Sequence, residues 1–226
     1  MKKNGFTLAE VLITLAIIGV VATLTLPSLL TNTAEQQAKS AMKKAVNTLT
    51  EAAQMSQAID GYDYASLTST DTGLGKEESQ SLYGILARRT AVDFGKVGAG
   101  KQPSSYTKNS SNYTMFLRDG SSISFDAANS TATGTTGSVS ADTIQTDGLP
   151  FGIGILYDTN GAKGPNMLSN CNSVTTGLKS GSDKTTADAA AACTKTARVI
   201  KDQFGLRLRG GFVVPNGAAA RWILEN

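Results

Sequence analysis

Residues 6–26 read FTLAEVLITLAIIGVVATLTL, and this run decides how the chain is organised. Its length of about twenty mostly apolar residues matches what an α-helix needs to cross a bilayer. Met-Lys-Lys precedes the run, and no basic cluster lies immediately after it. The positive-inside bias therefore places the N-terminus in the cytoplasm. The sequence therefore predicts one membrane-spanning helix followed by a domain outside the cytoplasm.

Glu10 is the one charged residue inside this run. A secretory signal peptide is the competing interpretation, but its apolar core is usually shorter, holds no charge and ends at a small-residue cleavage site. A carboxylate at mid-membrane costs on the order of 2.5–3.5 kcal/mol, and less near the end of the span. Glu10 therefore needs a partner or a function, and the segment favours an anchor over a signal peptide.

With its flanks, the segment reads KKNGFTLAEVLITLAIIGVVATLTLP over residues 2–27. It resembles the N-terminus of type IV pilins and of the pseudopilins of type II secretion. The resemblance implies that a prepilin peptidase cuts between Gly5 and Phe6 and that Phe6 becomes the N-methylated first residue. It also implies that Glu10 is the acidic residue of that family and that Pro27 is its proline.

The physical properties of these residues agree with those roles. After cleavage the Phe6 amine is charged and lies one helical turn from Glu10, whose carboxylate is stabilised near a helix N-terminus. In a filament the same carboxylate can pair with the amine of a neighbouring chain and set the axial register of apolar helices. Pro27 removes a backbone donor, so we expect a kink or local melting just before it.

The helix is predicted to continue to about residue 56. Its second half carries apolar residues at three- and four-residue steps: Leu30, Ala34, Ala38, Ala41, Met42, Ala45, Leu49, Ala52 and Ile59. A short helix is expected in residues 76–89, with Leu82, Ile85 and Leu86 inward. The fold class is α+β: a pilin-like long N-terminal helix, with a transmembrane first half, packed against an antiparallel β-sheet.

The sheet is predicted from several strand patterns. Two strands flank Asp119-Gly120, residues 151–158 form the strongest strand, and residues 204–209 (FGLRLR) form another. A last hairpin is expected around Asn216-Gly217. Residues 127–148 are too polar to bury and are predicted to be an exposed loop.

Residues 167–200 are interpreted as an insertion that holds both cysteines and an alanine-rich helix around residues 185–201. A domain outside the cytoplasm lies in an oxidising compartment, so we expect a disulfide between Cys171 and Cys193, worth about 3 kcal/mol in the chain-entropy model. The disulfide-closed C-terminal region of many pilins is only approximately similar, because further strands follow Cys193 here.

Two parts of the sequence are candidate ligand sites. Asp158 and Asn160 lie in an oxygen-rich turn, which makes calcium the candidate metal, since some secretion pseudopilins bind calcium in a C-terminal loop. The spacing lacks the acidic run of a calcium loop, so a hydrogen-bonded turn is favoured. The basic C-terminal stretch suggests DNA, but Arg207 and Arg209 alternate with leucines, which favours a solvated strand face over nucleic acid.

Catalysis is not expected. The chain has no histidine, and it shows no Gly-x-Ser-x-Gly elbow, phosphate loop or paired-carboxylate motif. The formal charge of +3 falls to +1 without Lys2 and Lys3, with 19 basic and 18 acidic side chains left, so net charge gives little support to a polyanion partner. No cofactor is required by this interpretation.

These inferences give one leading hypothesis: a structural subunit of a type IV pilus-like or type II secretion-like filament. Its expected partners are a prepilin peptidase/methyltransferase, other pilin-like subunits, an inner-membrane assembly platform and the membrane through helix 6–26. It would be inserted once in the cytoplasmic membrane and then enter a filament in the periplasm or at the cell surface. The alternative is a single-pass anchored binding or adhesion domain that does not polymerise. The predicted segments are a leader (1–5), a membrane and assembly half-helix (6–30), an extracytoplasmic half-helix (31–60) and a globular domain (61–226).

Overall fold

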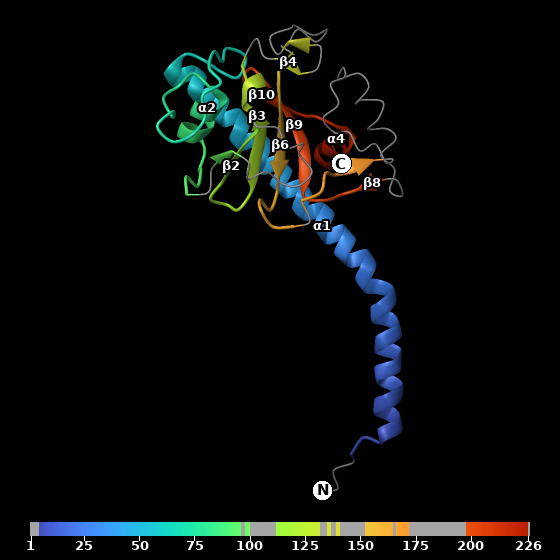
Figure 1. Cartoon of the computed structure of the whole chain (residues 1–226). Coiled ribbons are helices and arrows are strands. Elements are labelled where there is room, and N and C mark those ends of the chain that lie inside the picture. Colours follow the sequence, from blue (N-terminus) through green and yellow to red (C-terminus); the bar gives the residue numbers. More distant parts are fainter. Residues whose placement is uncertain are drawn as a thin grey trace. The chain divides into compact units, whose positions relative to one another are not determined.

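The computed structural model of the chain describes residues 5–95, 98–99, 112–131, 135–136, 139–140, 152–164, 166–171 and 198–225. The chain divides into two compact units, Met1–Gln37 and Ala38–Asn226. Figure 1 shows the ribbon coloured along the sequence.

The long helix α1 spans Leu8–Asp60 and contributes to both units. It ends at Gly61, whose φ of 80° suits glycine and whose N–H donates to the Ser56 carbonyl at 3.2 Å. The helix therefore starts two residues later than predicted. Its end at Asp60 lies four residues beyond the periodic stretch that was expected to stop near residue 56 and coincides with the predicted bound of the half-helix segment 31–60. It continues through Pro27 without a break, so local melting does not occur there, and the expected kink stays a prediction.

A six-stranded antiparallel sheet forms the second unit, with strand order β1-β2-β3-β6-β9-β10. Its strands are β1 (Gly98–Ala99), β2 (Asn112–Phe116), β3 (Ser122–Asp126), β6 (Ile153–Asp158), β9 (Gln203–Arg209) and β10 (Phe212–Pro215). The centre is β6, which pairs Ile155 with Phe125 of β3 and with Leu206 of β9. The α+β class and the antiparallel sheet are confirmed.

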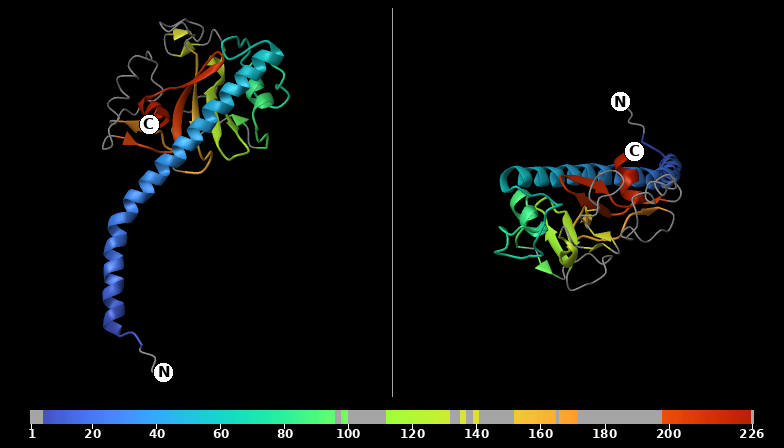
Figure 2. Two further views of the ribbon diagram at one scale, coloured as in Figure 1. Left: turned by 180° about the vertical axis from the view of Figure 1, so that it is seen from behind. Right: turned by 90° about the horizontal axis from the view of Figure 1, so that it is seen from above.

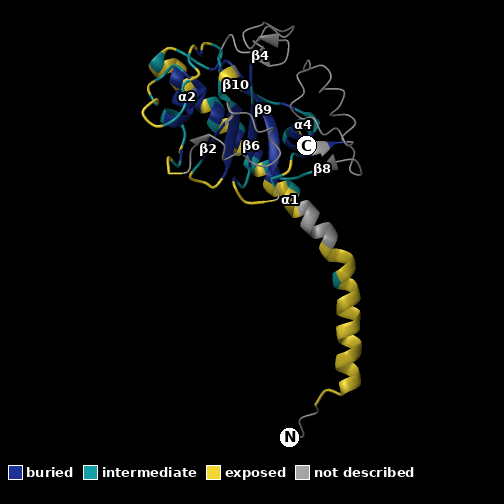
Figure 3. Cartoon of the chain, viewed as in Figure 1, coloured by how far each residue is buried: buried dark blue, intermediate teal, exposed yellow. Residues whose placement is uncertain are grey.

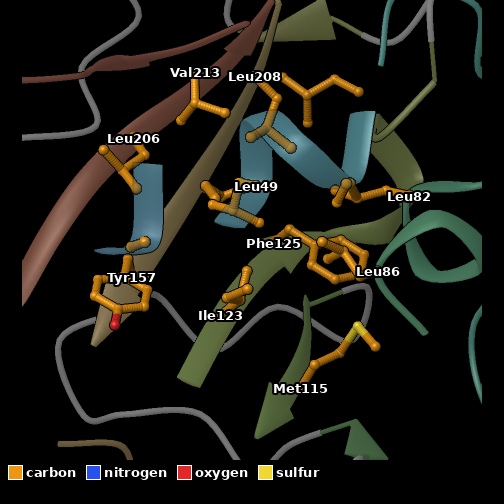
Figure 4. Close-up of a cluster of buried hydrophobic side chains, with 14 of the residues drawn as sticks. Leu49, Leu82, Leu86, Met115, Ile123, Phe125, Tyr157, Leu206, Leu208 and Val213 are labelled. Atoms are coloured by element: carbon orange, nitrogen blue, oxygen red, sulfur yellow. The ribbon is translucent and has the colours of Figure 1, made fainter. Parts of the chain in front are cut away.

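The second half of α1 covers one face of this sheet (Figure 2). Its buried residues are Ala38, Met42, Ala45, Leu49, Ala52 and Ala53. They share one core with the inward residues of the strands, several of which are labelled in Figure 4: Met115, Ile123, Phe125, Tyr157, Leu206, Leu208 and Val213. The predicted stripe ends earlier than expected, because Ile59 is 64% exposed.

The predicted short helix is present as α2 (Leu82–Arg89), with Leu82, Ile85 and Leu86 fully buried. It begins later than residue 76 because Ser81 caps it: the Ser81 hydroxyl accepts from the Gly84 N–H at 3.0 Å. The Asp119-Gly120 hairpin is also confirmed as the turn between β2 and β3, and Gly120 has a φ of 93°.

Asn216-Gly217 does not turn a hairpin. The turn of the last hairpin is Gly210-Gly211, between β9 and β10, and Asn216-Gly217 instead leads into the helix α4 (Ala218–Glu225). The sequence AAARWILE places Ala219, Ala220 and Ile223 on one buried side, a helical spacing that the hairpin interpretation overlooked.

The solvated face predicted for residues 204–209 is also wrong. Every residue of β9 is buried, including Arg207 (1% exposed) and Arg209 (3% exposed). Both arginines lie on the sheet face opposite α1, since Leu206 and Leu208 belong to the core. The Arg207 guanidinium donates to Asn216 Oδ1 at 3.4 Å. Alternation showed that the strand has two different faces, but it did not show that both are covered.

The two ends of the predicted insertion pair with each other. Strand β7 (Asn170–Cys171) lies antiparallel to β8 (Arg198–Val199). The alanine-rich helix around residues 185–201 falls mostly outside the described residues, and its predicted end at Arg198–Val199 is strand instead. Within the predicted exposed loop 127–148, the described parts are residues 127–131, which include the 3-10 turn η1 (Ala127–Asn129), and the antiparallel pair of β4 (Thr135–Thr136) and β5 (Val139–Ser140). Ser130 is only 1% exposed, so the prediction that this segment is too polar to bury is wrong there.

Candidate functional site

The predicted cleavage site lies just before α1, in an exposed stretch. Residues 5–7 have no regular secondary structure, and Phe6 is 88% exposed. A side chain added at Gly5 would meet no heavy atom within 4 Å. The Gly5–Phe6 bond is therefore accessible in the chain.

Thr7 and Glu10 form a reciprocal cap at the start of α1. The Thr7 N–H and the Thr7 hydroxyl both donate to Glu10 Oε2, each at 2.8 Å, and the Glu10 N–H lies 3.3 Å from Thr7 Oγ1. This is a capping box, in which the N-cap hydroxyl and the acidic side chain three residues later satisfy each other's backbone donors. The sequence signal for this cap is Thr-x-x-Glu at residues 7–10; the prediction paired Glu10 with the Phe6 amine and did not include Thr7.

The apolar span follows directly. Leu8–Leu26 has a mean hydropathy of 2.3, and by length and composition it is long and apolar enough to cross a membrane. Figure 3 shows this stretch of α1 as exposed in the isolated chain. Its threonines keep their hydroxyls within the helix: Thr14, Thr23 and Thr25 donate to carbonyls three or four residues earlier, at 2.8–2.9 Å. Such internal bonds allow polar side chains to lie in an apolar medium.

Residues 1–26 match the family model of the prokaryotic N-terminal methylation motif. This motif is the signature of pilins and pseudopilins, so the resemblance of the first residues to those proteins is confirmed. The match covers the leader, the capping box and the apolar span. It ends at residue 26, before the second unit begins at Ala38. No curated protein and no solved structure gives a significant match to the chain.

In the turn after β6, the carboxylates of Asp158 and Asp202 accept hydrogen bonds from the surrounding chain. Asp158 is buried, and its two oxygens accept from the Asn160 N–H at 3.0 Å and from Gln203 Nε2 at 2.8 Å. Burial raises the pKa of Asp158 to about 6. Asn160 in turn donates through Nδ2 to Asp202 at 3.2 Å.

Asp202, which the sequence analysis did not single out, fixes the other side of this turn. Its carboxylate accepts from the N–H groups of Asn166 at 2.7 Å and Met167 at 2.8 Å. A calcium ion at Asp158 would have to displace such donors, and among the described residues no three His, Cys, Asp or Glu side chains gather as a metal site. The contacts fit the structural turn better than a metal site, and calcium binding stays an untested prediction.

The remaining predicted residues are placed as follows. Cys171 is buried and is not a free thiol, while Cys193 lies outside the described residues, so their pairing stays a prediction. The side chain of Pro27 is also not described. Arg207 and Arg209 are buried, so they do not form the exposed basic surface that binding of a DNA backbone requires.

Proposed function

We propose that the chain is the precursor of a type IV pilus-like or type II secretion-like filament subunit. The observation that carries the proposal is the methylation motif placed on a capped apolar helix: an accessible Gly5–Phe6 bond, the Thr7–Glu10 box and the span Leu8–Leu26 follow one another without a gap. A prepilin peptidase would cut that bond and methylate the Phe6 amine.

Membrane insertion would come first. With Lys2 and Lys3 on the cytoplasmic side, Leu8–Leu26 crosses once and the unit Ala38–Asn226 lies outside the cytoplasm. The assembly platform of the inner membrane and other pilin-like subunits are the partners that this route requires. The second half of α1 is already covered by its own sheet, so it is the exposed first half that is free to pack against other helices.

Glu10 would then act between subunits. The capping box uses one carboxylate oxygen, Oε2, for both Thr7 donors. We infer that Oε1 accepts the ammonium of a neighbouring chain's Phe6, which sets the axial register of helices that are otherwise apolar. The cap holds the carboxylate at the start of the helix while leaving this second oxygen for the partner.

The decisive experiment compares N-terminal peptides by mass spectrometry, from sheared surface filaments and from membranes. A peptide that starts at N-methylated Phe6 in sheared filaments supports a surface filament subunit. The same peptide in membranes alone favours a pseudopilin-like or low-abundance role. An intact Met1 or a cut beyond Leu26 contradicts the proposal.

A matched pair of variants separates the charge of Glu10 from its cap. Glu10→Gln keeps an oxygen that can accept from Thr7, because glutamine also serves in capping boxes, but it removes the negative charge. We expect normal cleavage and lost incorporation into filaments. Glu35→Gln makes the same substitution outside the apolar span and should assemble normally. Normal incorporation of Glu10→Gln into filaments would contradict the proposed role of the charge. If neither the parent chain nor Glu10→Gln enters filaments and the variant keeps the parent's membrane localisation, the anchored binding domain that does not polymerise is the better interpretation.

A further inference from the structure

A cavity of about 150 Å³ lies between the second half of α1 and the β2–β3 hairpin. Its inner wall is apolar and buried: Leu49 comes from α1, Ile123 from β3 and the ring of Tyr157 from β6, and all three are labelled in Figure 4. Its outer end is polar, where Lys44 of α1 faces Asp119 of the hairpin turn. The whole site belongs to the second unit.

The cavity is preformed because its frame is tied by hydrogen bonds. The Arg118 N–H donates to the Ala91 carbonyl at 2.8 Å, and the Ser121 hydroxyl and N–H donate to Asp119 Oδ1 at 2.6 and 3.0 Å. Gly161 packs so closely on Gly120 that a Cβ there would lie 2.4 Å from the Gly120 carbonyl. The space itself exists because α1 and the segment after α2 present alanines, Ala45 and Ala91, where larger side chains would fill it.

The outer end is closed by an ion pair. Lys44 Nζ lies 2.7 Å from Asp119 Oδ2, with the side chains 62% and 31% exposed. A charged ligand would have to break this pair, whereas a neutral hydroxyl can accept from the ammonium and donate to the carboxylate without removing either charge. The ion pair therefore favours a neutral molecule with one polar end over a charged one.

We propose that this cavity binds one small neutral molecule with a single aromatic ring and a hydroxyl, of the phenol class. Apolar cavities of about this volume stay dry and accept benzene. The ring lies among Leu49, Ile123 and Tyr157, and the hydroxyl meets Lys44 and Asp119 at the outer end. This site is independent of the filament proposal, since it uses neither the methylation motif nor the apolar span.

The test uses the full chain in lipid bicelles with labelled Ile and Leu methyl groups, titrated with phenol and followed by NMR. We expect saturable shifts at Ile123, Leu49 and Leu117, with a dissociation constant on the order of 1 mM, as is usual for very small ligands. The methyls of Ile223, in the same unit but outside the cavity, should not move. Ile13 and Ile17, in the membrane span, should show only the unsaturable drift of phenol partitioning into lipid.

Two variants fill the space from different sides. Ala91→Leu acts from an exposed rim position, and Ala45→Leu acts from within α1; each should weaken phenol binding at least about tenfold. Ala58→Leu, at an exposed position of α1 outside the cavity, is the matched control and should bind phenol as the parent does. Absence of saturable shifts at Ile123 and Leu49, or equal binding by Ala91→Leu and Ala58→Leu, overturns the proposal.

Discussion

Gly161 offers the sharpest test of how the second unit packs. Its φ is 67°, and a Cβ built on it would lie 2.4 Å from the backbone oxygen of Gly120 in the neighbouring turn. An alanine in the left-handed region costs roughly 1–2 kcal/mol, and forcing an extra methyl group into a packed site costs roughly 1–3 kcal/mol more. We therefore expect Gly161→Ala to lower the free energy of unfolding by about 2–5 kcal/mol.

Gly61 provides the matched control. Its φ is 80°, yet an added Cβ would meet no heavy atom within 4 Å. Gly61→Ala should therefore show the conformational cost alone, about 1–2 kcal/mol. The assay is urea unfolding of the full chain in detergent, followed by the fluorescence of Trp222, the one tryptophan, which packs against the main core.

The difference between the two variants measures the contact of Gly161 with Gly120. A larger loss for Gly161→Ala supports the tight packing of the two turns. Equal losses would refute it, because the hairpin turn would then have moved aside at no cost. The same result would weaken the frame of the cavity, which rests on that contact.

Four further predictions concern single residues. Leu49→Ala should lower the free energy of unfolding by about 2–5 kcal/mol in the same urea assay, since Leu49 is 1% exposed. The hydrogen bond from Arg89, opposed by burial, holds the pKa of Asp60 below its usual value. The stability that Asp60 contributes is therefore present above pH ~4 and is lost as the pH falls further. Asp60→Asn should make the free energy of unfolding depend less on pH below ~4. Burial raises the pKa of Asp158 to about 6, so its contribution has the opposite sign: stability falls as the pH rises from ~4 to 6, and Asp158→Asn should remove this loss. Thr7→Val should speed amide exchange at Leu8–Glu10 by removing a cap worth about 1 kcal/mol, whereas Thr7→Ser should not.

The sequence was most informative where one physical requirement dominates. The apolar span with its single carboxylate predicted the membrane anchor, and the resemblance of residues 2–27 to pilin N-termini implied the candidate processing site. The apolar run of residues 151–158 and the alternation of residues 204–209 predicted two central strands. Turn chemistry gave the Asp119-Gly120 hairpin for the same reason, since few dipeptides tolerate positive φ.

It was least informative where the outcome depends on what covers a surface. The alternation in β9 could not reveal that Arg207 and Arg209 are buried, because their cover comes from elsewhere in the fold. Asn216-Gly217 satisfies a helix entry as well as a hairpin, and only the spacing of Ala219, Ala220 and Ile223 distinguishes the two. The partnership of Lys44 with Asp119 spans 75 residues and leaves no local signal.

The capping box suggests how one carboxylate can serve two states of the same chain. A lone carboxylate in an apolar span is costly, but two donors from Thr7 already reach one oxygen of Glu10 before any neighbour arrives. In the proposed assembly, the second oxygen, Oε1 of Glu10, accepts from the Phe6 ammonium of a neighbouring chain. Cleavage itself creates this ammonium. Uncut subunits would lack that ammonium, so under this proposal processing is also the step that makes Glu10 pairing possible. If the proposal is correct, cleavage must precede Glu10 pairing, because the ammonium that pairs with Glu10 forms only when the Gly5–Phe6 bond is cut.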